Sequence, residues 1–178
     1  MDETPIGRLV FLLATAAAIL GGAALVAVTA VTVISVIGRA FIPLGLGAIA
    51  GDVELVQAGI LFAVCSFLPW CHLERGHALV AIVTDKFPVR VSALLEALWD
   101  MFMLVAAAFI AWRFWSGLVD KFGNHESTFI LRIPIWIAYA AGLVGLAIFL
   151  IVALYCVVRS ANNAVAHEPV KPLSGGGE

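Results

Sequence analysis

Glu96 and Asp100 are the residues whose types and spacing most readily suggest chemistry, because both carboxylates fall inside an apolar segment. Side chains four residues apart share one face of a helix. A carboxylate deep in a bilayer costs on the order of 2.5–3.5 kcal/mol, so this face should not meet lipid. The two acids could form a proton or cation relay, or they could occupy the shallow first turns of a helix that starts at the interface. They could also mark a packing face on which a basic group or a backbone donor neutralises one of them.

The histidines do not form a ligand pattern. His72 and His77 are five residues apart, which places them on different helix faces, unlike a pair four apart that binds one metal ion. The sequence also lacks a P-loop, a Gly-x-Ser-x-Gly phrase and a zinc-hydrolase motif. We therefore predict no enzyme activity, no metal site and no cofactor. The alternative from this class is a four-span redox or haem protein that uses His72, His77, Glu96 and Asp100.

The elements that carry these residues are membrane spans. Leu9 to Ile37 is a run of twenty-nine residues without a charged side chain. A helix of that length reaches about 44 Å, against a hydrocarbon core of roughly 30 Å. The whole chain is 63% hydrophobic and 12% charged, whereas soluble domains are about 45–50% apolar and about 25% charged. The sequence therefore predicts an all-α integral membrane protein.

The remaining apolar segments complete four transmembrane helices in one membrane domain, residues 1–165. A segment between the second and third spans has apolar residues between charged ends, and we expect it to form an interfacial helix. A plain cytoplasmic turn is the alternative for this segment. The tail, residues 166–178, is rich in Pro, Gly and Ser and is expected to be disordered. The expected spans are about 9–37, 54–73, 91–114 and 133–158.

Basic residues flanking the spans predict the orientation. Six of them collect on the side that holds both termini, and four collect on the other side. This count places the termini in the cytoplasm and loops 40–52 and 116–132 in the periplasm. Tryptophans near the span ends, Trp136 among them, are typical of anchors in membrane lipids. With a net charge of −2 and no run of Lys or Arg, the chain has no expected nucleic-acid partner.

The same topology indicates partners for the acidic residues. Arg75 and Arg90 are expected on the side of Glu96, and the long side chain of Arg75 could reach a buried acid. Arg39 should end the first span on the opposite side, so it is a poor partner for Glu96. Asp52 and Glu54 begin the second span, where a helix N-terminus favours negative charge. Helix capping is therefore the default expectation for both.

Several short phrases follow one another along residues 8 to 158: Arg39 within Ile-Gly-Arg-Ala-Phe, Glu54-Leu55, Glu74-Arg75-Gly76-His77, Phe87-Pro88, Ser127-Thr128, and Ile133-Pro134-Ile135-Trp136. In this order they resemble the small membrane subunit of tripartite ATP-independent periplasmic (TRAP) transporters, the DctQ type. Each phrase alone is short, and the ordered set across four spans carries the resemblance. Ala81 departs from the family pattern, which often has an acid or hydroxyl residue four positions after the histidine.

The resemblance implies a subunit of an importer in a bacterial inner membrane. A periplasmic binding protein would capture an organic acid, and a large membrane subunit would transport it with a sodium gradient. This chain would be the scaffold of the large subunit, and it could help to dock the binding protein. The motif residues would then be subunit contacts and would bind no substrate. A small self-sufficient exporter is the remaining alternative.

Small residues predict that the chain does not function as a monomer. Gly21, Gly22, Gly142, Gly145 and Ala106 to Ala108 offer faces for close helix packing. Such faces can join helices of this chain to each other as well as to a partner.

Overall fold

The computed structural model describes residues 5–44, 47–74 and 89–166. Their regular elements are all helical: α1 (Pro5–Ala40), the short 3-10 helix η1 (Ile42–Leu44), α2 (Asp52–Leu73), α4 (Val89–Gly123) and α5 (Trp136–Ala166). Four of these helices are long and apolar enough to cross a membrane. The prediction of an all-α membrane protein with four spans is therefore confirmed. The expected interfacial helix and the expected tail beyond Ala166 lie outside the described residues.

The helices extend beyond the apolar runs that reveal them. At 36 residues, α1 reaches about 54 Å. α4 continues past the expected end at 114 to Gly123, through amphipathic turns that carry Asp120 and Lys121. α5 begins at Trp136 and not at 133, because the backbone of Ile133 and Ile135 bonds to the preceding loop.

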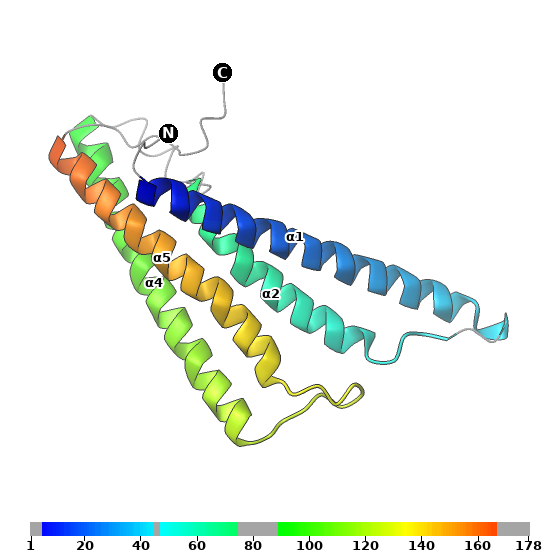
Figure 1. Cartoon of the computed structure of the whole chain (residues 1–178). Coiled ribbons are helices and arrows are strands. Elements are labelled where there is room, and N and C mark those ends of the chain that lie inside the picture. Colours follow the sequence, from blue (N-terminus) through cyan, green and yellow to red (C-terminus); the bar gives the residue numbers. More distant parts are fainter. Residues whose placement is uncertain (1–4, 45–46, 75–88, 167–178) are drawn as a thin grey trace.

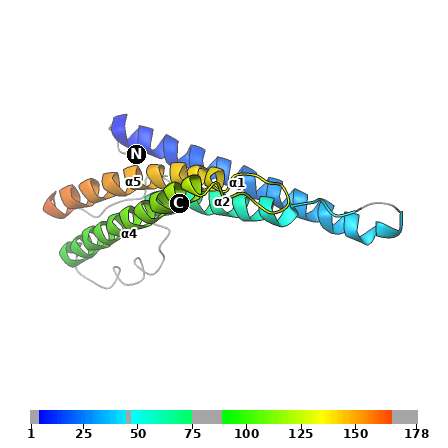
Figure 2. The same cartoon turned by 90° about the horizontal axis from the view of Figure 1, so that it is seen from below.

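The helices form an open layer in the order α1, α2, α5, α4 (Figure 1). Neighbours in this order pack along their lengths, and the N-terminal part of α1 also reaches α5. α1 and α4 are the two edge helices of the layer. The C-terminal end of α1 extends beyond the other three helices (Figure 1 and Figure 2).

Small residues allow the helices to approach closely. A Cβ added at Gly21 would lie 3.0 Å from the Cβ of Ser66, and one added at Gly145 would lie 2.8 Å from the backbone of Cys65. These glycines therefore join α1 to α2 and α5 to α2 within the chain. Gly22, in contrast, has no atom within 4 Å of its added Cβ.

Two apolar clusters form the interior. The first joins α1, α2 and α5 through Val10, Ala14, Leu73, Val152 and Cys156, and the second joins α2, α4 and α5 through Cys65, Ala107, Leu146 and Phe149. Most other large apolar side chains are exposed on the outer faces of the layer. Lipid tails satisfy such surfaces, so the exposure fits a protein that lies in a membrane.

Candidate functional site

The charged and hydrogen-bonding side chains gather at the two ends of α2. The Asp52 cluster comprises Ser35, Arg39, Asp52, Glu54 and the loop 124–135, at the N-terminal end of α2. The Asp100 cluster comprises His72, Asp100 and Ser160, near the C-terminal end of α2. The 22 residues of α2 separate the two clusters by about 30 Å.

Asp52 is the centre of the first cluster. One of its carboxylate oxygens accepts hydrogen bonds from Ser35 Oγ and Arg39 Nη2, both at 2.5 Å. The other oxygen accepts from the backbone N–H of Val53 at 2.8 Å. Asp52 therefore satisfies a donor in the first turn of α2, in line with the capping expectation, and it also ties α2 to the end of α1. The pairing with Arg39 is absent from the sequence-based expectations, which placed Arg39 at the opposite end of the fold from Glu96 but gave it no partner.

Glu54 acts across the fold and not on its own helix. Its carboxylate accepts hydrogen bonds from the backbone N–H of Ile130 at 2.8 Å and of Leu131 at 3.0 Å. The N-cap position of α2 is Gly51, which makes no side-chain cap. The expectation that Glu54 caps α2 is therefore wrong, because two N–H groups of a loop 76 and 77 residues away take both of its oxygens.

The loop that Glu54 holds is ordered by its own hydrogen bonds. Thr128 donates its N–H to the Ile133 carbonyl at 2.9 Å and accepts from the Ile133 N–H at 3.1 Å. Ser127 and Pro134 form an isolated bridge. Trp136 then starts α5, with its ring packed edge-on against Phe122 at 5.7 Å. Pro134 and Trp136 thus belong to the connection that carries the loop back into the membrane.

Gly51 permits the close approach of this loop to α2. Its φ of 78° lies in the left-handed region, which other residues adopt only with strain. An added Cβ would also clash with the side chain of Leu131. Glycine at this position therefore lets Leu131 come close enough for its N–H to reach Glu54.

The Asp100 cluster is buried between three helices. Asp100, His72 and Ser160 are 4%, 3% and 1% exposed. Ser160 Oγ donates a hydrogen bond to Asp100, and His72 Nε2 lies 3.7 Å from the other oxygen of the same carboxylate. The His72 ring also packs edge-on against Phe149 at 5.8 Å. The cluster therefore connects α4 to α5 and to α2.

The burial of Asp100 fits the packing-face interpretation, in which a neighbouring helix satisfies the acid. His72 is one basic neighbour of Asp100, whereas the sequence-based expectation was an arginine. Glu96, one turn earlier, is half-buried. Arg75, Gly76 and His77 lie outside the described residues, so the expected contact with Arg75 stays a prediction.

Ser160 is absent from the sequence-based expectations, and His72 appears there only in the redox or haem alternative. His72 ends the second span and Ser160 lies near the end of the fourth. Successive spans alternate in direction, so the ends of these two spans lie on the same side of the membrane. Only the packing of the helices selects them from the other polar residues on that side. Within residues 5–44, 47–74 and 89–166, no group of three His, Cys, Asp or Glu side chains could hold a metal ion.

Comparison with known proteins gives one match. The family model of the tripartite ATP-independent periplasmic transporters, DctQ component, matches residues 28–163, about three quarters of the chain. This range contains every described residue of both clusters. No curated protein and no solved structure matches the chain. DctQ is a family of transporter components and not of enzymes. The chain therefore belongs to the DctQ family, the small membrane component of TRAP transporters.

Proposed function

We propose that this small TRAP component is the membrane scaffold of a sodium-driven importer of organic acids. It holds the large membrane component, which transports the solute, and it helps to dock the periplasmic binding protein. The proposal places the chain in the bacterial inner membrane with both termini in the cytoplasm. Family membership supports the partners, and the flanking basic residues support the orientation.

The observation that carries the scaffold role is that polar contacts between helices are present at both ends of α2. Arg39 and Asp52 join α1 to α2 at one end, and Asp100 joins α4 to α5 and α2 at the other. Breaking the buried contacts of Asp100 leaves polar groups without water to replace the lost bonds. Contacts at both ends of α2 oppose the sliding of one helix against another. This property suits a fixed support better than a moving element.

The loop at the Asp52 cluster supports the docking role. Phe129 is 100% exposed and Ile130 is 60% exposed, although Glu54 and Thr128 hold the backbone beside them. A rigid loop loses little conformational entropy on binding, and exposed aromatic side chains often anchor protein contacts. On the proposed orientation this loop faces the periplasm, where the binding protein is.

Uptake in cells tests the role directly. Cells that express the large component and the binding protein should take up the labelled organic acid only when this chain is also present, and only with an inward sodium gradient. Potassium in place of sodium is the control for the gradient. Full uptake without this chain would contradict the scaffold proposal. Reporter fusions at Asn124 and Ser174 should report opposite sides of the membrane, with Ser174 in the cytoplasm.

A further inference from the structure

The outer face of α1 carries a continuous apolar seam that the described residues of this chain do not cover. Its nine residues follow alternating steps of three and four, so they fall on one stripe of the helix. All nine are exposed, Val26 at 72% and Ile19 at 67%. We name this stripe the outer seam: Leu9, Leu12, Ala16, Ile19, Ala23, Val26, Ala30, Val33 and Ile37.

Along the outer seam, alanine recurs every seven residues of the chain, at Ala16, Ala23 and Ala30. Larger side chains flank each alanine along the seam. Small residues in a membrane helix let another helix approach closely, and a seven-residue repeat keeps the small positions aligned along a left-handed crossing. Contact with lipid tails does not require small residues at regular intervals.

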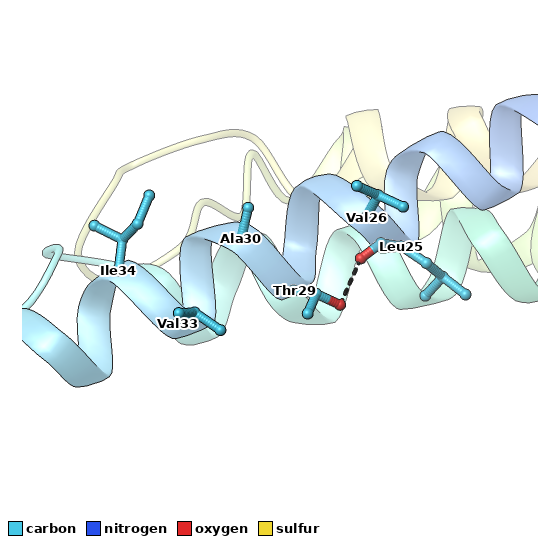
Figure 3. A pocket seen from close by; sticks show the side chains of 6 residues that line it. All are labelled: Leu25, Val26, Thr29, Ala30, Val33 and Ile34. Carbon is cyan, nitrogen blue, oxygen red and sulfur yellow. Dashed lines mark hydrogen bonds between the residues drawn. The ribbon is translucent and has the colours of Figure 1, made fainter.

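The structure shows a shallow, open hollow on the surface of α1 at one of these alanines (Figure 3). The four residues Val26, Thr29, Ala30 and Val33 are spaced i, i+3, i+4 and i+7. This is the arrangement that surrounds a knob side chain from a facing helix in knobs-into-holes packing. Leu25 and Ile34 extend the rim of the hollow.

The hollow is apolar in spite of its threonine. Thr29 Oγ1 donates a hydrogen bond to the Leu25 carbonyl at 2.8 Å, as Figure 3 shows. The hydroxyl hydrogen is therefore used within α1. An apolar knob fits this hollow better than a polar ligand does.

The opposite face of α1 shows how small residues act in this fold. Ala14, Ala17 and Gly21 are buried there, and Gly21 approaches Ser66 of α2 closely. The inner face thus uses small residues to hold a neighbouring helix. The outer seam has the same kind of positions without a neighbour from the described chain.

We propose that the outer seam of α1 docks one transmembrane helix of the large membrane component, with an apolar side chain of that helix seated over Ala30. The inference rests on the proposed function and names the surface that it uses. The seam runs through four heptads, so it is long enough for a partner helix to follow it across the hydrocarbon core. α1 is also an edge helix, so a partner helix beside it would continue the layer (Figure 1).

The outer face of α4, at the other edge, provides the contrast. It has an exposed seam with the same spacing, but bulky residues fill it: Leu94, Leu98, Met101, Val105, Ala108, Trp112, Trp115, Val119 and Phe122. Ala108 is its single small position. This seam suits lipid contact, and Ala108 is a matched control for Ala30.

The experiment compares Ala30→Phe with Ala108→Phe in the full chain, co-expressed with the large component and purified in mild detergent. Ala30→Phe should reduce the co-purified large component at least tenfold, whereas Ala108→Phe should leave it at the wild-type level. Both variants, purified alone, should keep the wild-type Tm, because both side chains point away from the chain's own helices. A photo-crosslinking residue at Val26 should capture the large component, and one at Val105 should not.

The outcomes separate the inference from the proposed function. A wild-type chain that fails to co-purify with the large component contradicts the proposed function. If the wild-type chain and Ala30→Phe both co-purify with the large component, the outer seam is not the docking surface. The proposed function is untouched by that result. Crosslinks from Val26 to a second copy of this chain, or to lipid alone, also overturn the assignment of the docking surface to the outer seam. If Ala30→Phe fails to fold, the crosslinks from Val26 and Val105 decide the question.

Discussion

Arg39 and Asp52 form an ion pair of 2.5 Å across the connection between α1 and α2. Their contributions should differ, because the Arg39 side chain is 54% exposed and that of Asp52 is 15% exposed. Asp52 also accepts from Ser35 and from the Val53 backbone. Asp52→Leu should therefore lower the Tm of the detergent-purified chain by more than Arg39→Gln does. An equal or larger loss in Arg39→Gln would show that the bonds of Asp52 to Ser35 and Val53 add nothing to the stability.

Glu54 is expected to control the order of the loop 128–131. Glu54→Leu removes the acceptor of the Ile130 and Leu131 N–H groups, so the exchange of both amides should become roughly fivefold faster or more, the change expected when one hydrogen bond is lost. Hydrogen exchange followed by mass spectrometry measures this. Gln57→Leu is the control, because Gln57 is exposed one turn further along α2. Unchanged amide exchange in Glu54→Leu would mean that the loop's own hydrogen bonds are sufficient to order it.

The buried hydroxyl of Ser160 should contribute more to the free energy of unfolding than an exposed serine hydroxyl does. Ser160→Ala removes a donor to the buried Asp100 carboxylate, which should cost roughly 1–3 kcal/mol of unfolding free energy. Ser116→Ala, at an exposed position of α4, should change the stability little. Denaturation in detergent compares the two variants. Equal stabilities would contradict the assignment of Asp100 to a packing face.

The scaffold role makes a separate prediction for Asp100. Asp100→Asn keeps the size of the side chain and removes its charge, so any loss of uptake should track loss of the assembled complex. Parallel assays of complex yield and of sodium-driven uptake test this. An intact complex without uptake would place Asp100 in a transport pathway, as the proton or cation relay interpretation requires.

The close contact between α5 and α2 can be probed at Gly145. Gly145→Ala should destabilise the chain by roughly 1–3 kcal/mol, because an added Cβ meets the Cys65 backbone, which cannot move aside. Gly22→Ala is the matched control, since its added Cβ meets nothing within 4 Å. The control should be neutral or more stable by up to about 1 kcal/mol through helix propensity. A tolerated Gly145→Ala would mean that the two helices can separate at little cost.

The sequence predicts the spans well because the bilayer sets a strict requirement on apolar length. It predicts their ends less well. The start of α5 depends on bonds that Glu126 and Thr128 make within the preceding loop, and no periodic pattern records them. Polar turns at the end of α4 likewise continue a helix beyond its apolar part.

Partner choice among charged residues was the least predictable feature. Glu54 and Asp52 both sit at a helix start, yet one bonds to a distant loop and the other to the end of α1. The difference depends on which side of α2 each residue occupies once α1 and the loop are packed. Asp100 and Ser160 are 60 residues apart, and only the register of α4 against α5 brings them together.

The open order of the four helices has a consequence for permeation. An open layer has two faces and two edges, and its described helices enclose no lumen. A solute that crosses the membrane beside this layer must touch a surface from another protein on its remaining sides. The walls of any aqueous path must therefore be completed by a partner, whichever face of the layer the path follows.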